Sequence, residues 1–393
     1  MSSSADDLFN AGMAKHRAGQ FAAASALYGE ALALAPEHLA ARHNLGLSLQ
    51  KLGRLEAALD QFGVAARQHP DSIAPLYSRG NLLLSMKHLE AAEADFRALL
   101  ALDPASDVAR ANLGQALIGQ GRFEEGFAAY EFRPERLKSN ARRLPFPEWQ
   151  GEPLAGRSLY VLGEQGHGDQ IMMARFLPRL QAMGARTTFA CLPPLHSLLE
   201  QVSPVGFFPT VESVPARDYW VASMSLPGRL GMRPETLPAA PYLKVPQAAA
   251  QRRPAVPAGD RPRIGFVWRG EARNPNDANR SLASPGAFLR LEDAGAEMVD
   301  LQTPEGDFAD MAARIATLDL VMAVDTAMVH LAGALGLPCW ALIPFLGADW
   351  RWPPGRTDTP WYGSVRVFRQ PVAGDWDGVF AQIRAALPRL RER

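Results

Sequence analysis

Residues 324–344 read VDTAMVHLAGALGLPCWALIP and hold the clearest alternation of strand and helix in the chain. The apolar run LDLVMAV, residues 318–324, leads into this stretch and is typical of a buried strand. Asp325 is the expected N-cap of a helix over residues 326–335, and Gly336 is expected to end that helix. The apolar run PCWALIP then predicts the next strand, so the stretch forms a βαβ unit of a parallel sheet.

The turn at Asp325 has the properties of an anion site. The first N–H groups of a helix lack partners within it and carry the positive end of its dipole. Open parallel sheets also bind ligands at the carboxyl ends of their strands. Thr326 adds a hydroxyl, and His330 lies four residues later on the same helix face. The alternative interpretation is an ordinary strand–helix cap followed by a core histidine.

The same alternation continues on both sides of this unit. Strand-length apolar runs alternate with helical stretches from SLYVLG (158–163) onwards, and again from RIGFVWRG (263–270). This pattern predicts two Rossmann-like α/β domains, at residues 157–250 and 261–393. The stretch KVPQAAAQRRPAVPAGDRP (244–262), rich in proline, alanine and arginine, is typical of a linker between them. The last helical stretch, WDGVFAQIRAAL (376–387), is expected to pack back across the first of them.

A glycine-rich turn, GEQGHGDQ, follows the first of these strands. Its glycines permit a tight backbone and close approach of a ligand, and they are Gly163, Gly166 and Gly168. Their spacing does not match the dinucleotide fingerprint GxGxxG. Asp169 heads the next helix, either as an acid favoured by the dipole or as a general base that deprotonates a hydroxyl acceptor. Glu164 and His167 compete for the role of base.

The first third of the chain repeats with a period of 34 residues. Four positions keep this period: Gly12, Gly46, Gly80 and Gly114; Ala24, Ala58 and Ala92; Tyr28, Phe62, Phe96 and Tyr130; and Pro36, Pro70 and Pro104. Small residues, an aromatic and a closing proline at this period are the tetratricopeptide pattern of helix pairs.

The fourth repeat departs from the pattern. Gly126 replaces the alanine, and Arg133 occupies the position of Ala31, Ala65 and Leu99 in the earlier repeats. We therefore predict a helical tetratricopeptide superhelix over residues 1–135, followed by a linker over residues 136–156.

One repeat position carries Asn10, Asn44, Ser78 and Asn112. Each carboxamide offers a donor and an acceptor, so the three asparagines would hold the backbone of an extended peptide on the concave face of the repeats. The alternative is that asparagine is simply common at this position.

Composition excludes several classes of protein. The chain has 393 residues, with 41 basic and 41 acidic side chains and a net charge of zero, which disfavours nucleic acid as the main partner. Its two cysteines lie in apolar runs, and no Cys/His cluster has the spacing of a metal site. The sequence shows neither a signal peptide nor an apolar run long enough to span a membrane, so a cytoplasmic location is expected.

Several motifs together resemble a known family. These are GEQGHGDQ, FVWRG…NRS, DLVMAVDTAMVHLAGALGLPCWALIP and ADWRW…TDTPWYGSVRVFRQ. They resemble the tetratricopeptide-linked glycosyltransferase-like proteins, whose catalytic region is similar to the lipopolysaccharide heptosyltransferases. The resemblance implies a GT-B fold and transfer of a sugar, with inversion, from a nucleotide-sugar to a hydroxyl without metal or other cofactor. Some relatives of this layout modify flagellin, so a Ser or Thr of a protein captured by the repeats is the implied acceptor.

The resemblance also implies roles for individual residues. Asp169 matches the catalytic base, while Asp325, Thr326 and His330 match the turn that holds the donor phosphates. The residue after that threonine is usually glycine and is Ala327 here. Further donor-site candidates are Arg280 in the NRS motif and Arg269, which replaces a small residue and either contacts a phosphate or blocks the pocket. Trp268, Trp350 and Trp352 are candidates for stacking on base or sugar, with core packing as the alternative for at least one of them. Arg351 is a candidate partner of a sugar carboxylate, with an ordinary ion pair as the alternative.

Two other functions fit the same sequence. The first is a non-catalytic scaffold, in which the repeats bind partners and the glycosyltransferase-like region is degenerate, because fold does not fix function. The second is a glycosyltransferase acting on lipid-linked or polysaccharide acceptors, with the repeats serving assembly.

Overall fold

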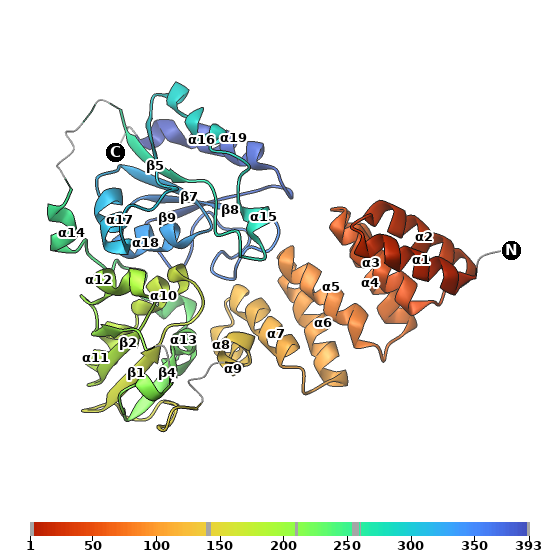
Figure 1. Ribbon diagram of the computed structural model, residues 1–393, viewed down its shortest axis with the longest axis horizontal. Helices are drawn as coiled ribbons and strands as arrows, with labels where there is room; N and C mark the ends of the chain where they lie inside the picture. The colour runs from red at the N-terminus through yellow and green to blue at the C-terminus, as the bar shows by residue number, and fades with distance from the viewer. Residues whose placement is uncertain (1–3, 139–142, 209–210, 254–258, 260, 391–393) are drawn as a thin grey trace. The chain divides into compact units, whose positions relative to one another are not determined.

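The computed structural model describes residues 4–138, 143–208, 211–253, 259 and 261–390. The chain forms two compact units, Met1–Gln120 and Gly121–Arg393. In Figure 1 the first runs from red to orange, and the second from yellow through green to blue. Parts of both predicted linkers, residues 139–142 and 254–258, lie outside the described residues.

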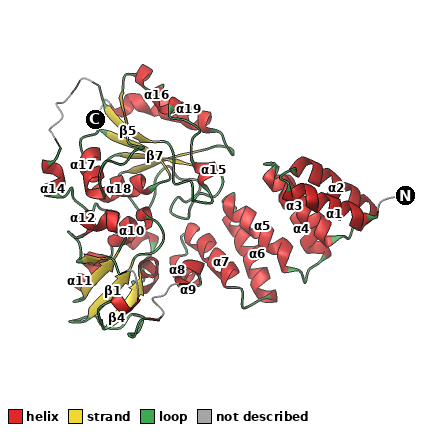
Figure 2. Cartoon of the chain, in the orientation of Figure 1, coloured by secondary structure: helices red, strands yellow, loops and turns green. Residues whose placement is uncertain are grey.

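The first unit is built from helix pairs (Figure 2). Its helices are α1 (Ala5–Arg17), α2 (Phe21–Leu34), α3 (Leu39–Lys51), α4 (Leu55–Gln68), α5 (Ile73–Ser85), α6 (Leu89–Leu102) and α7 (Asp107–Gly119). The periodic glycines explain the pairing, because Gly12, Gly46 and Gly80 each lie under the periodic aromatic ring of their own repeat. A Cβ atom on Gly46 would lie 2.5 Å from Cε1 of Phe62, and one on Gly12 would lie 2.6 Å from Cε1 of Tyr28.

The second helix of the fourth repeat belongs to the second compact unit. This helix is α8 (Phe123–Tyr130), and the short α9 (Pro134–Leu137) follows it. Phe127 of α8 packs on Gly228 in α13 (Leu226–Arg229), where an added Cβ would lie 3.0 Å from Cβ of Phe127. The 34-residue sequence pattern therefore extends beyond Gln120, where the first compact unit ends.

The first sheet of the second unit is parallel and has the order β3-β2-β1-β4. Its strands are β1 (Ser158–Leu162), β2 (Arg186–Ala190), β3 (Val205–Gly206) and β4 (Tyr219–Ala222). One apolar cluster on this sheet joins Tyr160 and Trp220 to Phe146 from the segment before β1. The helices of this part are α10 (His167–Ala174), α11 (Leu177–Ala182), α12 (His196–Leu199) and α13.

The second sheet is also parallel, with the order β6-β5-β7-β8-β9. Its strands are β5 (Arg263–Val267), β6 (Glu297–Asp300), β7 (Leu320–Val324), β8 (Cys339–Ile343) and β9 (Val365–Arg369). The helices around it are α14 (Gln247–Gln251), α15 (Asp277–Arg280), α16 (Gly286–Leu289), α17 (Phe308–Ile315), α18 (Ala327–Leu335) and α19 (Trp376–Ala386). Figure 1 shows α16 and α19 on one face of this sheet and α17 and α18 on the other.

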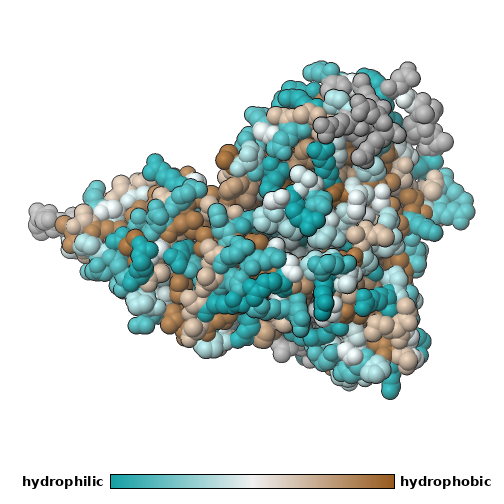
Figure 3. All heavy atoms as spheres, turned by 180° about the vertical axis from the view of Figure 1, so that it is seen from behind, coloured by the Kyte–Doolittle hydropathy of each residue, from teal (hydrophilic) through white to brown (hydrophobic). Residues whose placement is uncertain are grey.

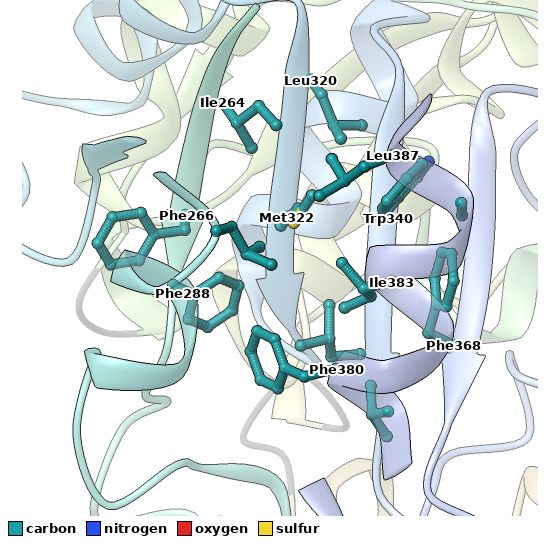
Figure 4. Packing of buried hydrophobic residues seen from close by; sticks show 14 of the residues in the cluster. Ile264, Phe266, Phe288, Leu320, Met322, Trp340, Phe368, Phe380, Ile383 and Leu387 are labelled. Carbon is teal, nitrogen blue, oxygen red and sulfur yellow. The ribbon is translucent and has the colours of Figure 1, made fainter. Parts of the chain in front are cut away.

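Helix α19 packs on the second sheet, so the prediction that this stretch crosses to the first α/β domain is wrong. Phe380 and Ile383 of α19 join Phe266, Phe288 and Met322 in one buried cluster (Figure 4). The amphipathic pattern of the stretch predicted a helix with one apolar face, but it did not identify the sheet that this face covers. The linker prediction for residues 244–262 also missed α14, a short helix within it.

Hydrophilic and hydrophobic residues are interspersed on the face shown in Figure 3. Among the described residues, no helix combines the length and the apolar character needed to cross a membrane. Both cysteines are free and buried: Cys191 directly follows β2 in the first sheet, and Cys339 begins β8 in the second.

Candidate functional site

The glycine-rich turn, residues 163–168, follows β1, and the turn at Asp325 and Thr326 follows β7. Each lies at the carboxyl end of its parallel sheet. The helices that they start, α10 and α18, pack directly on each other: a Cβ added to Gly168 would lie 2.5 Å from Cδ2 of His330 and 3.2 Å from Cα of Ala327. The turn after β7 lies beside the point where the second sheet reverses its strand order, between β5 and β7. Ligands of open parallel sheets bind at such points.

The turn after β7 leaves one hydroxyl without a partner. Helix α18 begins at Ala327 with Thr326 as its N-cap, so the prediction of Asp325 as N-cap is wrong by one residue. Thr326 makes no side-chain capping bond, and its buried Oγ1 has no hydrogen-bond partner among the described residues. Gly336 ends the helix as predicted, with a φ of 73°. An unpaired hydroxyl beside the open N–H groups of a helix start can donate to an anion.

Asp325 turns its carboxylate toward the tryptophan-rich segment. Its Oδ1 accepts a 3.0 Å hydrogen bond from Nε1 of Trp352. Burial raises the pKa of Asp325 to about 6, and the neighbouring Asp349 acts in the same direction, against the bond from Trp352. Asp325 is therefore a carboxyl that titrates close to neutral pH.

Of the two candidate arginines, only Arg280 reaches this turn. Its Nη1 donates a 2.8 Å hydrogen bond to the backbone carbonyl of Asp325, and its Nε lies 3.4 Å from Oδ1 of Asp277. Arg269 is exposed, and its backbone exchanges hydrogen bonds with the side chain of Gln302. The structure thus brings one fixed guanidinium and one exposed guanidinium to the loop after β5.

Of the three candidate tryptophans, only Trp268 is partly exposed. Trp350 and Trp352 are buried, and Trp268 is half-buried against the core of the second sheet. Stacking on a ligand is therefore the wrong interpretation for Trp350 and Trp352, and the alternative of core packing holds for both, because their rings pack in the interior. The rings of Trp350 and Trp361 meet at 5.3 Å.

His330 is buried beneath the contact between α10 and α18. Its Nδ1 lies 2.8 Å from the hydroxyl of Tyr362, and its ring lies 5.9 Å from that of Trp352. Burial holds the pKa of His330 well below its usual value, so the ring is neutral at pH 7. Its role as a phosphate ligand stays a prediction.

The glycines of the turn after β1 provide close approach. A Cβ on Gly163 would lie 2.7 Å from the carbonyl oxygen of Ala190, and Gly168 packs against His330 as described. Gly166 is the N-cap of α10 with an ordinary φ of −85°. The residue of this turn in the left-handed region is Gln165, with a φ of 59°.

Asp169 is held by two partners. Its Oδ2 accepts a 2.9 Å hydrogen bond from the backbone N–H of Gly166, and its Oδ1 forms an ion pair with Nη2 of Arg351. Arg351 also lies 2.7 Å from Oδ1 of Asp349, and its guanidinium stacks over the ring of Trp350 at 4.3 Å. Burial raises the pKa of Asp169, against the opposing effect of Arg351. Of the two interpretations of Arg351, the structure therefore shows the ion pair and not a guanidinium free for a sugar carboxylate.

The two competitors for the role of base have different surroundings. Glu164 is buried and forms a two-point ion pair with Arg133, at 3.1 Å and 2.6 Å. His167 is half-buried and stacks on Phe308, with ring centres 5.1 Å apart. Glu164 thus has a structural partner for each carboxylate oxygen, and His167 keeps access to solvent.

The predicted peptide-binding asparagines lie on the first helix of their repeats. Asn10 is exposed on α1. Asn44 on α3 donates to the carbonyl of Ala40 in its own helix, and Asn112 on α7 donates to Oδ1 of Asn81, both at 2.8 Å. Two of the three amide groups therefore have a bond within the chain, and a peptide would compete with that bond.

Sequence reasoning missed the residues that surround these turns. Tyr130 and Arg133 bond to Gln165 and Glu164 of the turn after β1. Tyr362 lies beside His330 on α18, and Asp349 pairs with Arg351, the partner of Asp169. Only Arg133 carried a signal, because it is a charge at a repeat position that is otherwise apolar. Among the described residues, no group of three or more His, Cys, Asp or Glu side chains could hold a metal ion.

Comparison with known proteins identifies the first region. Two tetratricopeptide repeat models match residues 16–79 and 77–131, so the N-terminal region carries tetratricopeptide repeats, as the 34-residue period predicted. A region of parallel sheets and helices follows it.

One curated relative extends over much of the chain. Protein FlbA of Caulobacter vibrioides is 29% identical over 328 residues, which cover 71% of this chain and 54% of FlbA. The chain thus spans about half the length of this relative.

Two of the similar solved structures each cover about a third of the chain. MamA (41-end) of Desulfovibrio magneticus RS-1 is 25% identical, with a TM-score of 0.33, over 35% of this chain and 80% of MamA. YrrB, a tetratricopeptide protein with an unusual peptide-binding site, is 20% identical, with a TM-score of 0.32, over 35% of this chain and 71% of YrrB.

Proposed function

We propose that the second unit is a GT-B glycosyltransferase that moves a sugar from a nucleotide-sugar to a hydroxyl group. The observation that carries this proposal is the unpartnered Thr326 hydroxyl at the start of α18. A buried hydroxyl without a partner costs free energy, so its retention fits a ligand that supplies the partner. The diphosphate or monophosphate of the donor is such a ligand.

The surroundings of Thr326 suit a leaving phosphate. The N–H groups of Ala327 and Met328 open α18, and Arg280 is fixed beside them by its bond to the carbonyl of Asp325. Donors that are already oriented stabilise developing negative charge without reorganisation. In this proposal they act without a metal ion, and the exposed Arg269 adds a second positive charge.

Asp169 is the proposed base, and its ion pair with Arg351 keeps Oδ1 from accepting a proton until an acceptor binds. Burial already raises the pKa of the Asp169 carboxyl, so it becomes a stronger base once the guanidinium moves away. We propose that the acceptor hydroxyl displaces Arg351 from Oδ1 and then gives its proton to the same oxygen. Attack on the opposite side from the leaving phosphate inverts the anomeric centre.

The repeats supply the proposed acceptor. Tetratricopeptide superhelices present their first helices to partners, and here those helices carry Asn10, Asn44 and Asn112. A Ser or Thr in a captured protein chain, with flagellin as the leading case, is the proposed acceptor.

The test uses the full chain and two variants. Purified protein is screened by thermal shift against ADP-, GDP-, UDP- and CMP-linked sugars, and the best donor is then used in a transfer assay with flagellin. Asp169→Asn is expected to keep the thermal shift and lose transfer by about 10²–10⁴-fold, the usual contribution of a general base. Thr326→Val is expected to reduce the thermal shift. An Asp169→Asn variant that transfers sugar at the normal rate contradicts the assignment of the base.

A non-catalytic scaffold is the second candidate, and the ion pair between Arg351 and Asp169 favours it. Both oxygens of Asp169 are engaged, and Arg351 is almost fully buried. In a scaffold the ion pair between Asp169 and Arg351 would never open to admit an acceptor. The scaffold predicts no thermal shift with any nucleotide-sugar, and equal melting temperatures with and without the four donor classes separate it from the enzyme.

A further inference from the structure

Helix α8 and the residues after it contact the turn that carries Asp169. Gln165, in the left-handed region of that turn, donates a 2.9 Å hydrogen bond from Nε2 to the hydroxyl of Tyr130. Arg133 pairs with Glu164, the neighbouring residue of the turn, at 3.1 Å and 2.6 Å. Two consecutive residues of the turn are therefore held by side chains from the fourth repeat.

The repeat pattern shows that both contacts are additions. Position 133 is Ala31, Ala65 or Leu99 in the earlier repeats, and all three are buried apolar residues. Arg133 is also buried, at 1% exposure. A buried guanidinium is tolerated only with a partner of opposite charge. Arg133 has two such partners, the buried Glu164 at 2.6 Å and the less buried Glu131 at 3.2 Å. The aromatic position is Tyr28, Phe62, Phe96 and Tyr130, which shows that phenylalanine fits the same packing.

Glu164 and its partner Arg133 also bond to residues that follow β4. The N–H of Met224 donates to Oε2 of Glu164 at 3.1 Å, and Nη2 of Arg133 donates to the hydroxyl of Ser225 at 3.0 Å. A left-handed conformation at a residue other than glycine persists where its surroundings hold it. Tyr130 and Arg133 thus hold the two turn residues that lie four and five positions before Asp169.

Helix α8 also reaches the partner of Asp169. Phe127 and Tyr130 pack edge-on against the ring of Trp350, with ring centres 5.8 Å and 6.3 Å apart. Trp350 in turn carries the guanidinium of Arg351 over its ring. One helix of repeat origin therefore contacts the supports of both members of the Asp169–Arg351 pair.

We propose that Tyr130 and Arg133 are positioning residues, which set the turn 163–168 and thereby the geometry of the Asp169–Arg351 pair. The consequence for activity rests on the function proposed above, whereas the consequence for the turn does not. The positioning is consequently tested by a measurement on the turn itself, with the transfer rate as a second readout.

The main variant is Tyr130→Phe, and Tyr28→Phe is its matched control. Both remove one hydroxyl from the same repeat position, but the Tyr28 hydroxyl has no hydrogen-bond partner among the described residues. Hydrogen exchange is followed at the bonded amides of the turn, those of Gly163, Glu164 and Gly166. Loss of one hydrogen bond corresponds to about a fivefold change, so these amides are expected to exchange about fivefold faster in Tyr130→Phe and unchanged in Tyr28→Phe.

The ion pair is tested by Arg133→Met combined with Glu164→Gln, because removing only one charge leaves the other buried and threatens the fold. This double variant is expected to accelerate exchange at the same amides. Where transfer is measurable, Tyr130→Phe is expected to lower the turnover rate about fivefold with nucleotide affinity unchanged.

The outcomes separate the two proposals. Equal exchange of the turn amides in Tyr130→Phe and Tyr28→Phe overturns the positioning role. A loss of activity that arises through weaker nucleotide binding also overturns it, because the nucleotide site lies on α18. Faster exchange in a protein that transfers sugar from none of the donors supports the positioning role and rejects the proposed function.

Discussion

The turns after β1 and β7 are built alike but differ in how their polar groups are satisfied. Both join a buried parallel strand to a helix, and the two helices pack on each other through Gly168. In the turn after β1, Asp169 and Glu164 each have partners on both carboxylate oxygens. In the turn after β7, the Thr326 hydroxyl has no partner among the described residues, and Asp325 is a half-buried acid with a raised pKa.

This difference indicates that the two turns have different roles. A turn whose polar groups are all paired is stable by itself and changes only when a partner is displaced. A turn with an unpaired hydroxyl and a destabilised carboxylate holds free energy that a ligand can release. The first arrangement suits a gated base and the second a binding site, and four changes test that contrast.

The largest expected effect comes from breaking the ion pair at Asp169. Arg351→Met leaves Asp169 and Asp349 without their buried cation, and is expected to lower the free energy of unfolding by about 3–5 kcal/mol. Arg356→Met is the matched control, because Arg356 pairs with Asp358 on the same segment but both side chains are about half exposed. That surface pair should contribute about 0–1 kcal/mol. Urea denaturation measures both variants. Similar losses in the free energy of unfolding would show that the Arg351 pair contributes no more than a surface pair.

The second effect is a pH dependence that belongs to the turn after β7. The pKa of Asp325 is raised to about 6 in the folded chain from an ordinary 3.8, so the unfolded state loses this proton first as the pH rises. Between pH 4 and 6 the unfolded state binds fewer protons, and stability therefore falls with rising pH by up to about 3 kcal/mol.

Asp325→Asn removes this titration and keeps an oxygen for the bond from Trp352. The variant is expected to be more stable than the unchanged protein at pH 7, with the difference vanishing below about pH 4. Urea denaturation at several pH values checks it. A stability difference between the variant and the unchanged protein that does not depend on pH contradicts the raised pKa of Asp325.

The third effect concerns the contact between the two turns. Gly168→Ala would place its Cβ 2.5 Å from His330 and 3.2 Å from Cα of Ala327, and is expected to cost about 1–3 kcal/mol because α10 and α18 must move apart. Gly166→Ala is the control, since its Cβ would meet Oδ2 of Asp169 at 3.4 Å. Its cost is about 0.5 kcal/mol, as for alanine at an N-cap. Equal thermal stability of the two variants would show that the helices are not in tight contact.

The smallest effect has an unusual sign. Thr326→Val replaces an unpaired buried hydroxyl with a methyl group, and is expected to stabilise the free protein by about 1 kcal/mol. Thr187→Val is the counterpart, because the Thr187 hydroxyl bonds to Ser203 at 2.9 Å and to Gln181 at 3.0 Å. It is expected to lose about 1–2 kcal/mol. Destabilisation by both variants would mean that Thr326 has a partner after all.

The sequence predicted the elements of the fold better than their packing partners. The 34-residue period and the alternation of apolar runs depend on local spacing, so the repeats and the parallel α/β region could be recognised from residues alone. The packing of α19 on the second sheet could not, because an amphipathic helix records that it has an apolar face but not which surface covers it.

In the candidate site too, local features could be predicted from the sequence and long-range partners could not. Glycine and first-turn chemistry located the turns at Gly163 and Thr326, and the loop position of Arg280 placed it beside the second. The partners of Asp169 and Glu164 come from residues 182 and 31 positions away in the chain. No local pattern records such pairs, and for this reason Arg351 was expected to face a ligand and Glu164 was a candidate base.

The two buried cysteines give this chain a native reporter for each sheet. Burial raises the pKa of Cys191 to about 12 and that of Cys339 further, so neither thiol reacts while its strand is closed. Cys191 directly follows β2 and Cys339 begins β8, and the chain has no other cysteine. The rates at which an alkylating reagent modifies the two positions, read by mass spectrometry, therefore measure how often each half of the α/β unit opens, without any engineered probe.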